Sequence, residues 1–380
     1  MFFLFVSWSF NLKTTGLQFG YFLALLFFVI FMVRGFREDR LSDKMLAWVM
    51  FFMAMLIQDY TFGFAGINVL WEELDGWPRH FPWLFPATVY FYFLAQTNAD
   101  FRLEKRHIYH VMPYIFYVLV SVVLLLAGRT PNNGLYQTTL GTVWDISVYV
   151  LNYGGIFYYF YRSLRIYRNY KFWAENQYSN LYEVELQWLR NFLWFFMIGA
   201  VIHLINTVID LVYDLPFDQD YYWQLFTVAT IIYVGFSGLT QEQNKNIHFE
   251  EENKTSENVK EMEKPLADEE NKLKEKLLTF MESQKPFLNP DLTLRQLAVL
   301  MHSNTSVLSG VINQGFGKNF NDFINEYRVQ SFQEAVKDEK NKNLTLVAIA
   351  YDCGFNSKAT FHRAIKKFTG NVPGAFTTTP

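Results

Sequence analysis

Long apolar stretches fill the first 240 residues, and shorter amphipathic repeats fill the last hundred. Seven apolar stretches can be counted, at residues 17–33, 45–57, 81–96, 108–127, 144–161, 192–212 and 222–239. Most approach the ~20 residues that a helix needs to cross about 30 Å of hydrocarbon. They are apolar all round rather than along one face, which favours a closed bundle of lipid-embedded helices over a large soluble helical core. The second and third stretches are short and would borrow flanking residues such as 58–67.

The loops between these stretches alternate in charge. Lys and Arg gather in the first, third and fifth loops, at Arg34, Arg37, Arg40 and Lys44, at Arg102, Lys105 and Arg106, and at Arg162, Arg165, Arg168 and Lys171. The second and sixth loops are acidic, with Glu72, Glu73 and Asp75, and with Asp214, Asp218 and Asp220. Basic residues stay on the cytoplasmic side of a membrane. The pattern predicts a multi-pass inner-membrane protein with its amino terminus outside and its carboxyl terminus in the cytoplasm.

Polar residues inside the sixth stretch are candidates for sensing a signal. His203, Asn206 and Asp210 are spaced i, i+3 and i+7 and therefore share one helix face. Ionisable groups within a membrane often face a cavity or a partner and mark function. The alternative is that they bridge neighbouring helices or lie at the interface. One His and one Asp are too few ligands for a metal site, so neither a metal nor a cofactor is expected.

Residues 241–270 are polar and contain one aromatic residue, Phe249. Such a segment cannot bury enough surface to fold alone, so it predicts a flexible or partly helical tether. A dimer-forming stalk that continues the last membrane helix is the alternative. The expected domains are therefore a transmembrane region at 1–240, a linker at 241–270 and a helical domain at 271–380.

From residue 271 the apolar period becomes helical and then repeats. An opening helix carries Leu273, Leu277 and Met281 and ends at Pro286. Two helix-turn-helix patterns follow, joined by a long helix over 320–336. In the first, Thr293 caps a helix over 294–301, residues 303–305 turn, and a second helix runs to about residue 314. In the second, Thr345 caps a helix to residue 352, and Gly354 ends it in the left-handed conformation. A last helix, capped by Asn356 or Ser357, spans 358–368.

Charge divides along the same boundaries. Residues 1–240 carry 15 basic and 17 acidic side chains, residues 241–284 carry 7 and 12, and residues 285–380 carry 11 and 7. A modestly basic end suits a polyanion, because phosphate neutralisation supplies most non-specific affinity for DNA. Cys353 is the only cysteine, so no disulfide can form within the chain.

Residues 272–376 resemble the AraC/XylS-type DNA-binding domain. The matching residues are Leu294, Leu297, Ala298, Ser303, Leu308, Gly317, Lys318, Phe320, Ile324, Arg328, Ile349, Ala350, Gly354, Phe355, Ser357, Phe361, Lys367, Phe368, Gly370 and Pro373. The resemblance implies seven helices with two helix-turn-helix units that read neighbouring major-groove segments. It also implies activation of transcription through contacts with RNA polymerase. The family has a small buried residue at the position of Cys353, so the resemblance implies that Cys353 lies in the core.

The second helix of each unit is expected to enter the major groove. Base reading is predicted for Thr305, Ser306 and Ser309 in the first unit and for Lys358, Ala359, His362 and Arg363 in the second. Phosphate contacts are predicted for Lys318, Arg328, Lys366 and Lys367. The family often has Arg where this chain has Gly310, and glycine cannot read a base. More of the specificity is therefore expected from the second unit, where Arg363 could grip a guanine edge with two hydrogen bonds.

The whole sequence thus predicts an all-α protein, with a polytopic bundle of about seven spans and a cytoplasmic domain that holds both helix-turn-helix units. The expected function is membrane-embedded, sequence-specific transcription regulation, with double-stranded DNA and the lipid bilayer as partners. RNA polymerase and a second copy of the chain are further candidates, and the signal is undefined. The chain shows no phosphate loop or nucleophile–base constellation, so it is not expected to be an enzyme. A transporter or membrane enzyme with an appended DNA-binding module is the alternative, and proteolytic release of the soluble part is a third possibility.

Overall fold

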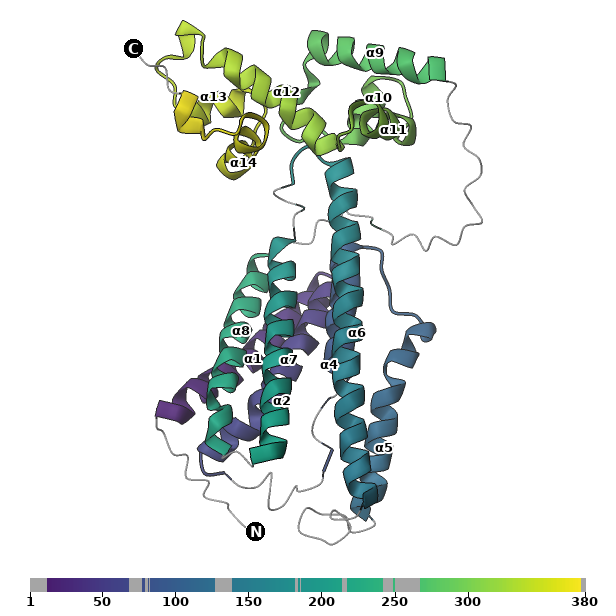
Figure 1. Cartoon of the computed structure of the whole chain (residues 1–380), viewed down its shortest axis with the longest axis vertical. Coiled ribbons are helices and arrows are strands. Elements are labelled where there is room, and N and C mark those ends of the chain that lie inside the picture. The colour runs from purple at the N-terminus through teal and green to yellow at the C-terminus, as the bar shows by residue number, and fades with distance from the viewer. Residues whose placement is uncertain are drawn as a thin grey trace. The chain divides into compact units, whose positions relative to one another are not determined.

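The computed structural model describes residues 12–67, 77–78, 81, 83–126, 139–181, 184, 186–213, 217–241, 249 and 267–376. Throughout these residues the regular structure is helical (Figure 1). The chain forms two compact units. The first comprises residues 1–167 and 186–250, and the second comprises residues 168–185 and 251–380. Most of the predicted linker, at 242–248 and 250–266, lies outside the described residues, as do Glu72, Glu73, Asp75 and Asp214.

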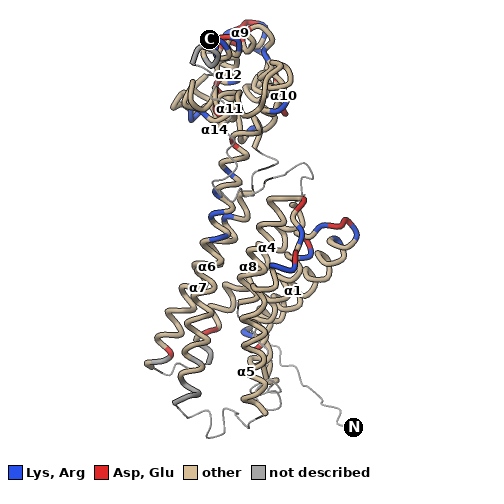
Figure 2. The backbone as a smooth tube through the Cα atoms, turned by 90° about the vertical axis from the view of Figure 1, so that its right-hand side faces the viewer, with Lys and Arg blue, Asp and Glu red and all other residues tan. Residues whose placement is uncertain are grey.

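Each of the seven apolar stretches lies in or overlaps a helix of the first unit. The helices are α1 (Leu12–Arg37), α2 (Leu41–Phe64), α4 (Leu84–Thr97), α5 (Met112–Leu126), α6 (Thr139–Gln177), α7 (Gln187–Tyr213) and α8 (Tyr221–Thr240). Short 3₁₀ helices, η1 (Lys105–His110) and η2 (Phe217–Asp220), precede α5 and α8. Charged residues are sparse along most of these helices and gather at the α1–α2 turn and in the second half of α6 (Figure 2).

Four of these helices are long and apolar enough to cross a membrane. They are Lys13–Arg37 within α1, Leu41–Phe64, Gln187–Asp210 within α7, and Tyr221–Thr240. The apolar helix α5 is shorter, at 15 residues. Large apolar side chains remain exposed on these helices, including Phe22 on α1, Leu119 and Leu126 on α5 and Val212 on α7. Soluble monomers rarely expose this much apolar surface, whereas lipid accommodates it.

Helices α1, α2 and α8 pack closely through small residues and one buried ion pair. A side chain at Gly235 of α8 would overlap the ring of Phe27 on α1, so the glycine allows the two backbones to approach. At the end of α1, Arg34 Nη2 lies 2.6 Å from Asp43 Oδ1 of α2 and also donates to the Gly238 carbonyl of α8, at 2.9 Å. Because that carbonyl lies in the last turn of α8, the guanidinium joins three helices at one point.

The second unit contains six α-helices between Ala267 and Phe376, all of which the structure describes. They are α9 (Ala267–Gln284), α10 (Leu294–Leu300), α11 (Thr305–Phe316), α12 (Phe320–Ala335), α13 (Leu346–Asp352) and α14 (Lys358–Thr369). Short 3₁₀ helices, η3 (Pro286–Leu288), η4 (Glu339–Asn341) and η5 (Pro373–Phe376), complete it. The resemblance implied seven helices; the last segment here is the 3₁₀ turn η5.

The helix boundaries follow the predicted caps. Thr293 accepts a hydrogen bond from the Gln296 amide, and the Gln296 side chain accepts one from the Thr293 amide, which makes a capping box at the start of α10. Thr345 and Ser357 cap α13 and α14 by accepting hydrogen bonds from the amides of Ala348 and Thr360. Gly354 has φ +92°, and a side chain there would overlap the Phe287 carbonyl, so both the backbone angle and the close approach require glycine.

Each helix-turn-helix unit has its own core, and α12 contributes to both. Leu277, Leu297, Leu308 and Phe323 are among the buried side chains of the first core. Phe332, Ile349, Phe355 and Phe361 belong to the second. Cys353 is 3% exposed within the second core, as the resemblance implies.

Candidate DNA-binding interface

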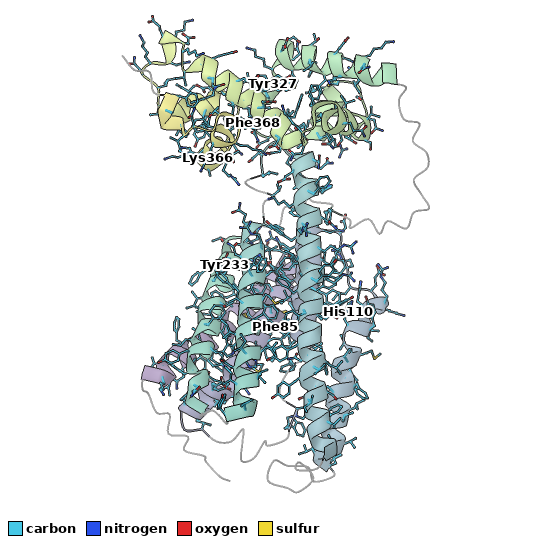
Figure 3. The ribbon with its side chains drawn as sticks, in the orientation of Figure 1. Phe85, His110, Tyr233, Tyr327, Lys366 and Phe368 are labelled. Atoms are coloured by element: carbon cyan, nitrogen blue, oxygen red, sulfur yellow. The ribbon has the colours of Figure 1, made fainter. Side chains whose placement is uncertain are left out.

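The last helix, α14, presents one polar face and buries the other. Lys358, Ala359, His362, Arg363 and Lys366 are exposed, whereas Thr360, Phe361, Ala364 and Ile365 are buried. Lys366 lies on the outer side of α14, and Phe368 lies toward α12, the helix of Tyr327 (Figure 3). The four base-reading residues predicted for the second unit therefore lie on one solvent-facing surface. Their arrangement fits a helix that enters the major groove.

Helix α11 offers a polar surface without charged side chains. Ser306 is exposed, and Thr305 and Ser309 are half-buried. Asn304, which was not predicted, caps this helix by accepting from the Ser306 amide at 2.7 Å. Asn313 Nδ2 donates to Ser309 Oγ at 3.2 Å, so an amide side chain extends the polar face that the three hydroxyls begin. Its spacing of one helical turn from Ser309 was the signal in the sequence.

Three of the four residues predicted to contact phosphate already have partners within the domain. Lys318 forms an ion pair with Glu326, and Lys367 forms one with Asp322, at 2.6 Å from Oδ1. Both lysines remain at least partly exposed and could exchange these partners for phosphate.

The phosphate contact predicted for Arg328 is wrong for this structure. Arg328 is 1% exposed and cannot reach a phosphate. Its Nε donates to the Phe287 carbonyl at 2.8 Å, and its Nη2 donates to the Asn289 carbonyl at 2.8 Å. Burial lowers the pKa of the guanidinium to about 10, so it remains protonated at neutral pH. The sequence did carry a signal: Arg328 lies four residues after Ile324, on the buried side of α12.

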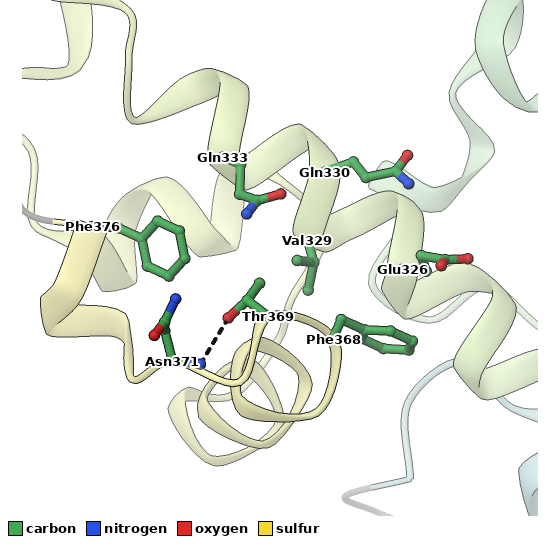
Figure 4. Close-up of a pocket in the computed structure, with 8 residues that line it drawn as sticks. All are labelled: Glu326, Val329, Gln330, Gln333, Phe368, Thr369, Asn371 and Phe376. Atoms are coloured by element: carbon green, nitrogen blue, oxygen red, sulfur yellow. Dashed lines mark hydrogen bonds between the residues drawn. The ribbon is translucent and has the colours of Figure 1, made fainter.

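A hollow of about 330 Å³ lies where the end of α14 meets α12 (Figure 4). It is lined by Glu326, Val329, Gln330, Gln333, Phe368, Thr369, Asn371 and Phe376. Within it the Asn371 amide donates to Thr369 Oγ1 at 3.2 Å. None of the residues predicted to read bases lines it, so the hollow is separate from the candidate interface.

The residues predicted for intramembrane sensing are placed unequally. The hydroxyl of Tyr153 on α6 lies 2.6 Å from His203 Nδ1 and 3.3 Å from Thr207 Oγ1, both on α7. The His203 ring also packs against Trp223 of α8, with centroids 5.7 Å apart. Asn206 is half-buried and Asp210 is exposed. His203 thus joins three helices, which is also what a bridging polar residue would do.

A second polar cluster in the first unit was not predicted from the sequence. His110 Nδ1 lies 2.5 Å from the hydroxyl of Tyr159 on α6, and Arg162 Nη2 donates to the hydroxyl of Tyr90 on α4 at 2.9 Å. Tyrosines in apolar stretches gave no signal of this pairing. Among the described residues, no group of three or more His, Cys, Asp or Glu side chains could hold a metal ion.

One of three comparisons with known proteins bears on the DNA-binding part. No curated protein matches the chain. A solved structure of a protein of unknown function from Listeria innocua is similar at 27% sequence identity, over 27% of this chain and 92% of that chain, with a TM-score of 0.24. A family model described as a helix-turn-helix domain matches residues 297–379. Together with the two helix-turn-helix units, this match supports a DNA-binding regulatory domain of the AraC type in the carboxyl-terminal part of the chain.

Proposed function

We propose that this protein is a membrane-embedded transcription regulator that reads a specific DNA sequence through α11 and α14. The observation that carries the proposal is the polar face of α14, where Lys358, His362 and Arg363 are all exposed on a helix whose other face is buried. Arginine at such a position can pair with a guanine edge through two hydrogen bonds, which discriminates by about 1–3 kcal/mol against the wrong base.

The membrane half of the proposal rests on the apolar helices of the first unit. Four are long and apolar enough to span a bilayer, and we infer that α4, α5 and α6 complete seven spans. Arg34, Arg37 and Arg40 at the α1–α2 turn favour a cytoplasmic position for that turn. The amino terminus would then lie outside and the DNA-binding domain in the cytoplasm. Fusions of a fluorescent reporter to the carboxyl end test this orientation, because fluorescence confined to the periplasm would overturn it.

The experiment for DNA reading uses the full chain in detergent or lipid discs. Chromosomal sites bound in cells are mapped by crosslinking, and the strongest fragment serves as the probe in a mobility-shift assay. The double substitution Lys358→Glu with Arg363→Ala should abolish specific binding, since it removes a guanine reader and reverses a charge at the groove.

A matched control distinguishes base reading from a general loss of positive charge. Lys340→Glu with Lys342→Ala changes the net charge equally at exposed positions in and directly after η4. This control should retain specific binding. If the α14 variant binds the probe as tightly as the wild type, α14 does not read the site.

A further inference from the structure

A short segment after α6, residues 178–180, lies against the DNA-binding domain within the second unit. We call it the docking segment. Its Tyr178 forms an antiparallel backbone bridge with Thr293, the residue that caps α10. The Ser179 amide donates to the Leu292 carbonyl at 3.1 Å, and Ser179 is 0% exposed. The docking segment is therefore paired through its main chain to the strand-like turn that enters the first helix-turn-helix unit.

Three side chains of α12 converge on one carbonyl oxygen of the docking segment. Asn321 Nδ2 donates to the Ser179 carbonyl at 2.9 Å, Asn325 Nδ2 at 3.4 Å and Arg328 Nη1 at 3.3 Å. Arg328 Nη2 also donates to Ser179 Oγ at 3.1 Å. A carbonyl oxygen has only two lone pairs, so three donors around it satisfy its full capacity. The three side chains thus form a binding site for the backbone of an extended segment.

Arg328 also lies where the two helix-turn-helix units meet. Its Nε donates to the Phe287 carbonyl, in the connection between α9 and α10. Its guanidinium lies over the ring of Phe355, which enters the core of the second unit, with Cζ 6.0 Å from the ring centroid. Gly354, in the turn of the second unit, packs against Phe287 and Leu288. Arg328, which donates hydrogen bonds to Ser179, therefore contacts both helix-turn-helix units.

We infer that the docking segment sets the relative pose of the two helix-turn-helix units, and so couples α6 to DNA reading, within one copy of the chain. The inference rests on the proposed function, because it names how that DNA reading is regulated. Helix α6 begins in the first of the two compact units of the chain, where its Tyr153 contacts His203. It ends at Gln177, directly before the docking segment. A change in the packing of α6 thus reaches Arg328 without passing through the linker.

The coupling is reciprocal, as thermodynamic linkage requires. If docking favours one pose of α11 and α14, DNA that selects a pose must strengthen or weaken docking by the same factor. Coupled sites of this kind change each other's affinity by about 5- to 150-fold.

The first test measures backbone hydrogen exchange in the full chain, reconstituted at one copy per lipid disc. The docking segment should be protected, because its Ser179 amide is hydrogen-bonded and buried. Asn321→Asp replaces an amide donor by an acceptor of the same size, so oxygen faces the Tyr178 and Ser179 carbonyls. An acidic side chain in the first turn suits α12, so the domain should stay folded while exchange at residues 178–180 rises. Gln330→Glu is the matched control, exposed on the same helix, and should leave this exchange unchanged.

The second test compares DNA affinity of these two variants in the full chain, with the strongest mapped fragment as probe. Asn321→Asp should shift the affinity by about fivefold or more relative to Gln330→Glu. A ratio within twofold would overturn the coupling. Rapid exchange of residues 178–180 in the wild-type chain, or protection only in discs that hold two copies, would overturn docking within one copy. A chain that shows protection but binds no DNA would reject the proposed function and leave the docking contact standing.

Discussion

The ammonium group of Lys367, in the last turn of α14, lies 2.6 and 2.7 Å from the two carboxylate oxygens of Asp322 in the first turn of α12. The pair joins the end of α14 to the first turn of α12. It also gives Lys367 a partner that DNA phosphate would have to replace. The partner is partly exposed, so the exchange needs little rearrangement.

Substituting Asp322→Asn should therefore strengthen non-specific DNA binding and make it more sensitive to salt. With its partner neutral, Lys367 can bind a phosphate, and each added phosphate contact steepens the slope of log affinity against log salt by about 0.9. Titrations of full chain with non-cognate duplex at several salt concentrations measure this slope. Asp352→Asn, an exposed position with the same charge change, should raise affinity without the same steepening. Equal slopes for the two variants would contradict the role of Lys367.

Two glycines of the DNA-binding domain should respond to alanine in opposite directions. Gly354 has φ +92°, and an added side chain would overlap the Phe287 carbonyl, so Gly354→Ala should destabilise the domain by about 1–3 kcal/mol. Gly310 lies within α11 with open space around its Cα, so Gly310→Ala should stabilise it by about 1 kcal/mol. Both changes in stability are measured by heating the full chain and monitoring protease cleavage within residues 267–376. A destabilised Gly310→Ala would contradict the open surroundings of that position.

The Arg34–Asp43 ion pair, which lies where α1, α2 and α8 meet, should contribute far more to the free energy of unfolding than the exposed Arg37. Arg34→Ala leaves buried Asp43 with only the longer ion pair to Arg40, whose Nη1 lies 3.9 Å from Oδ2, and removes a donor from the end of α8. Loss of one partner from a buried pair costs about 3–5 kcal/mol, less here because the arginine side chain is 19% exposed. Arg37→Ala, where the side chain is 81% exposed, is the control. Denaturant unfolding in detergent, followed by tryptophan fluorescence, should separate the two variants clearly.

Cys353 should react slowly with thiol reagents in the folded protein. Burial raises the pKa of its thiol, and only the thiolate is nucleophilic. Because the folded state holds this proton more tightly, the stabilising contribution is complete below the unfolded pKa of about 8.5 and is lost as pH rises through the higher folded value. Maleimide labelling between pH 7 and 9, with and without denaturant, measures the difference. A cysteine at exposed Asn371, in a Cys353→Ala background, should label quickly; equal rates at the two sites would refute burial.

Local features of the fold could be predicted from the sequence, and contacts between distant segments could not. Thr293 and Thr345 cap their helices as predicted, because capping depends on residues three positions apart. Of the two candidates for α14, Ser357 is the cap. The apolar stretches also predict helices, because a run of apolar residues is a local feature of the sequence. The number of membrane spans depends on how short stretches such as α4 and α5 extend, and four helices meet the length and apolarity required.

The residues of the candidate site show the same difference between local patterns and contacts of distant segments. The exposed face of α14 follows from a helical period, so Lys358, His362 and Arg363 could be placed together from the sequence. Arg328 was assigned to phosphate because of its charge, although its position relative to Ile324 indicated burial. Its pairing with Ser179 joins residues 149 positions apart, and nothing in the local pattern around Ser179 marks it.

The contact at Ser179 is made largely with the peptide backbone, which every residue type shares. Alanine scanning of residues 178–180 would therefore leave most of that contact intact and report the loop as unimportant. Other small residues at the buried Ser179 would keep the same backbone contacts, whereas those contacts depend directly on the side-chain amides and guanidinium of α12. Searches for related proteins with the same internal linkage should accordingly compare the receiving helix rather than the loop that it grips.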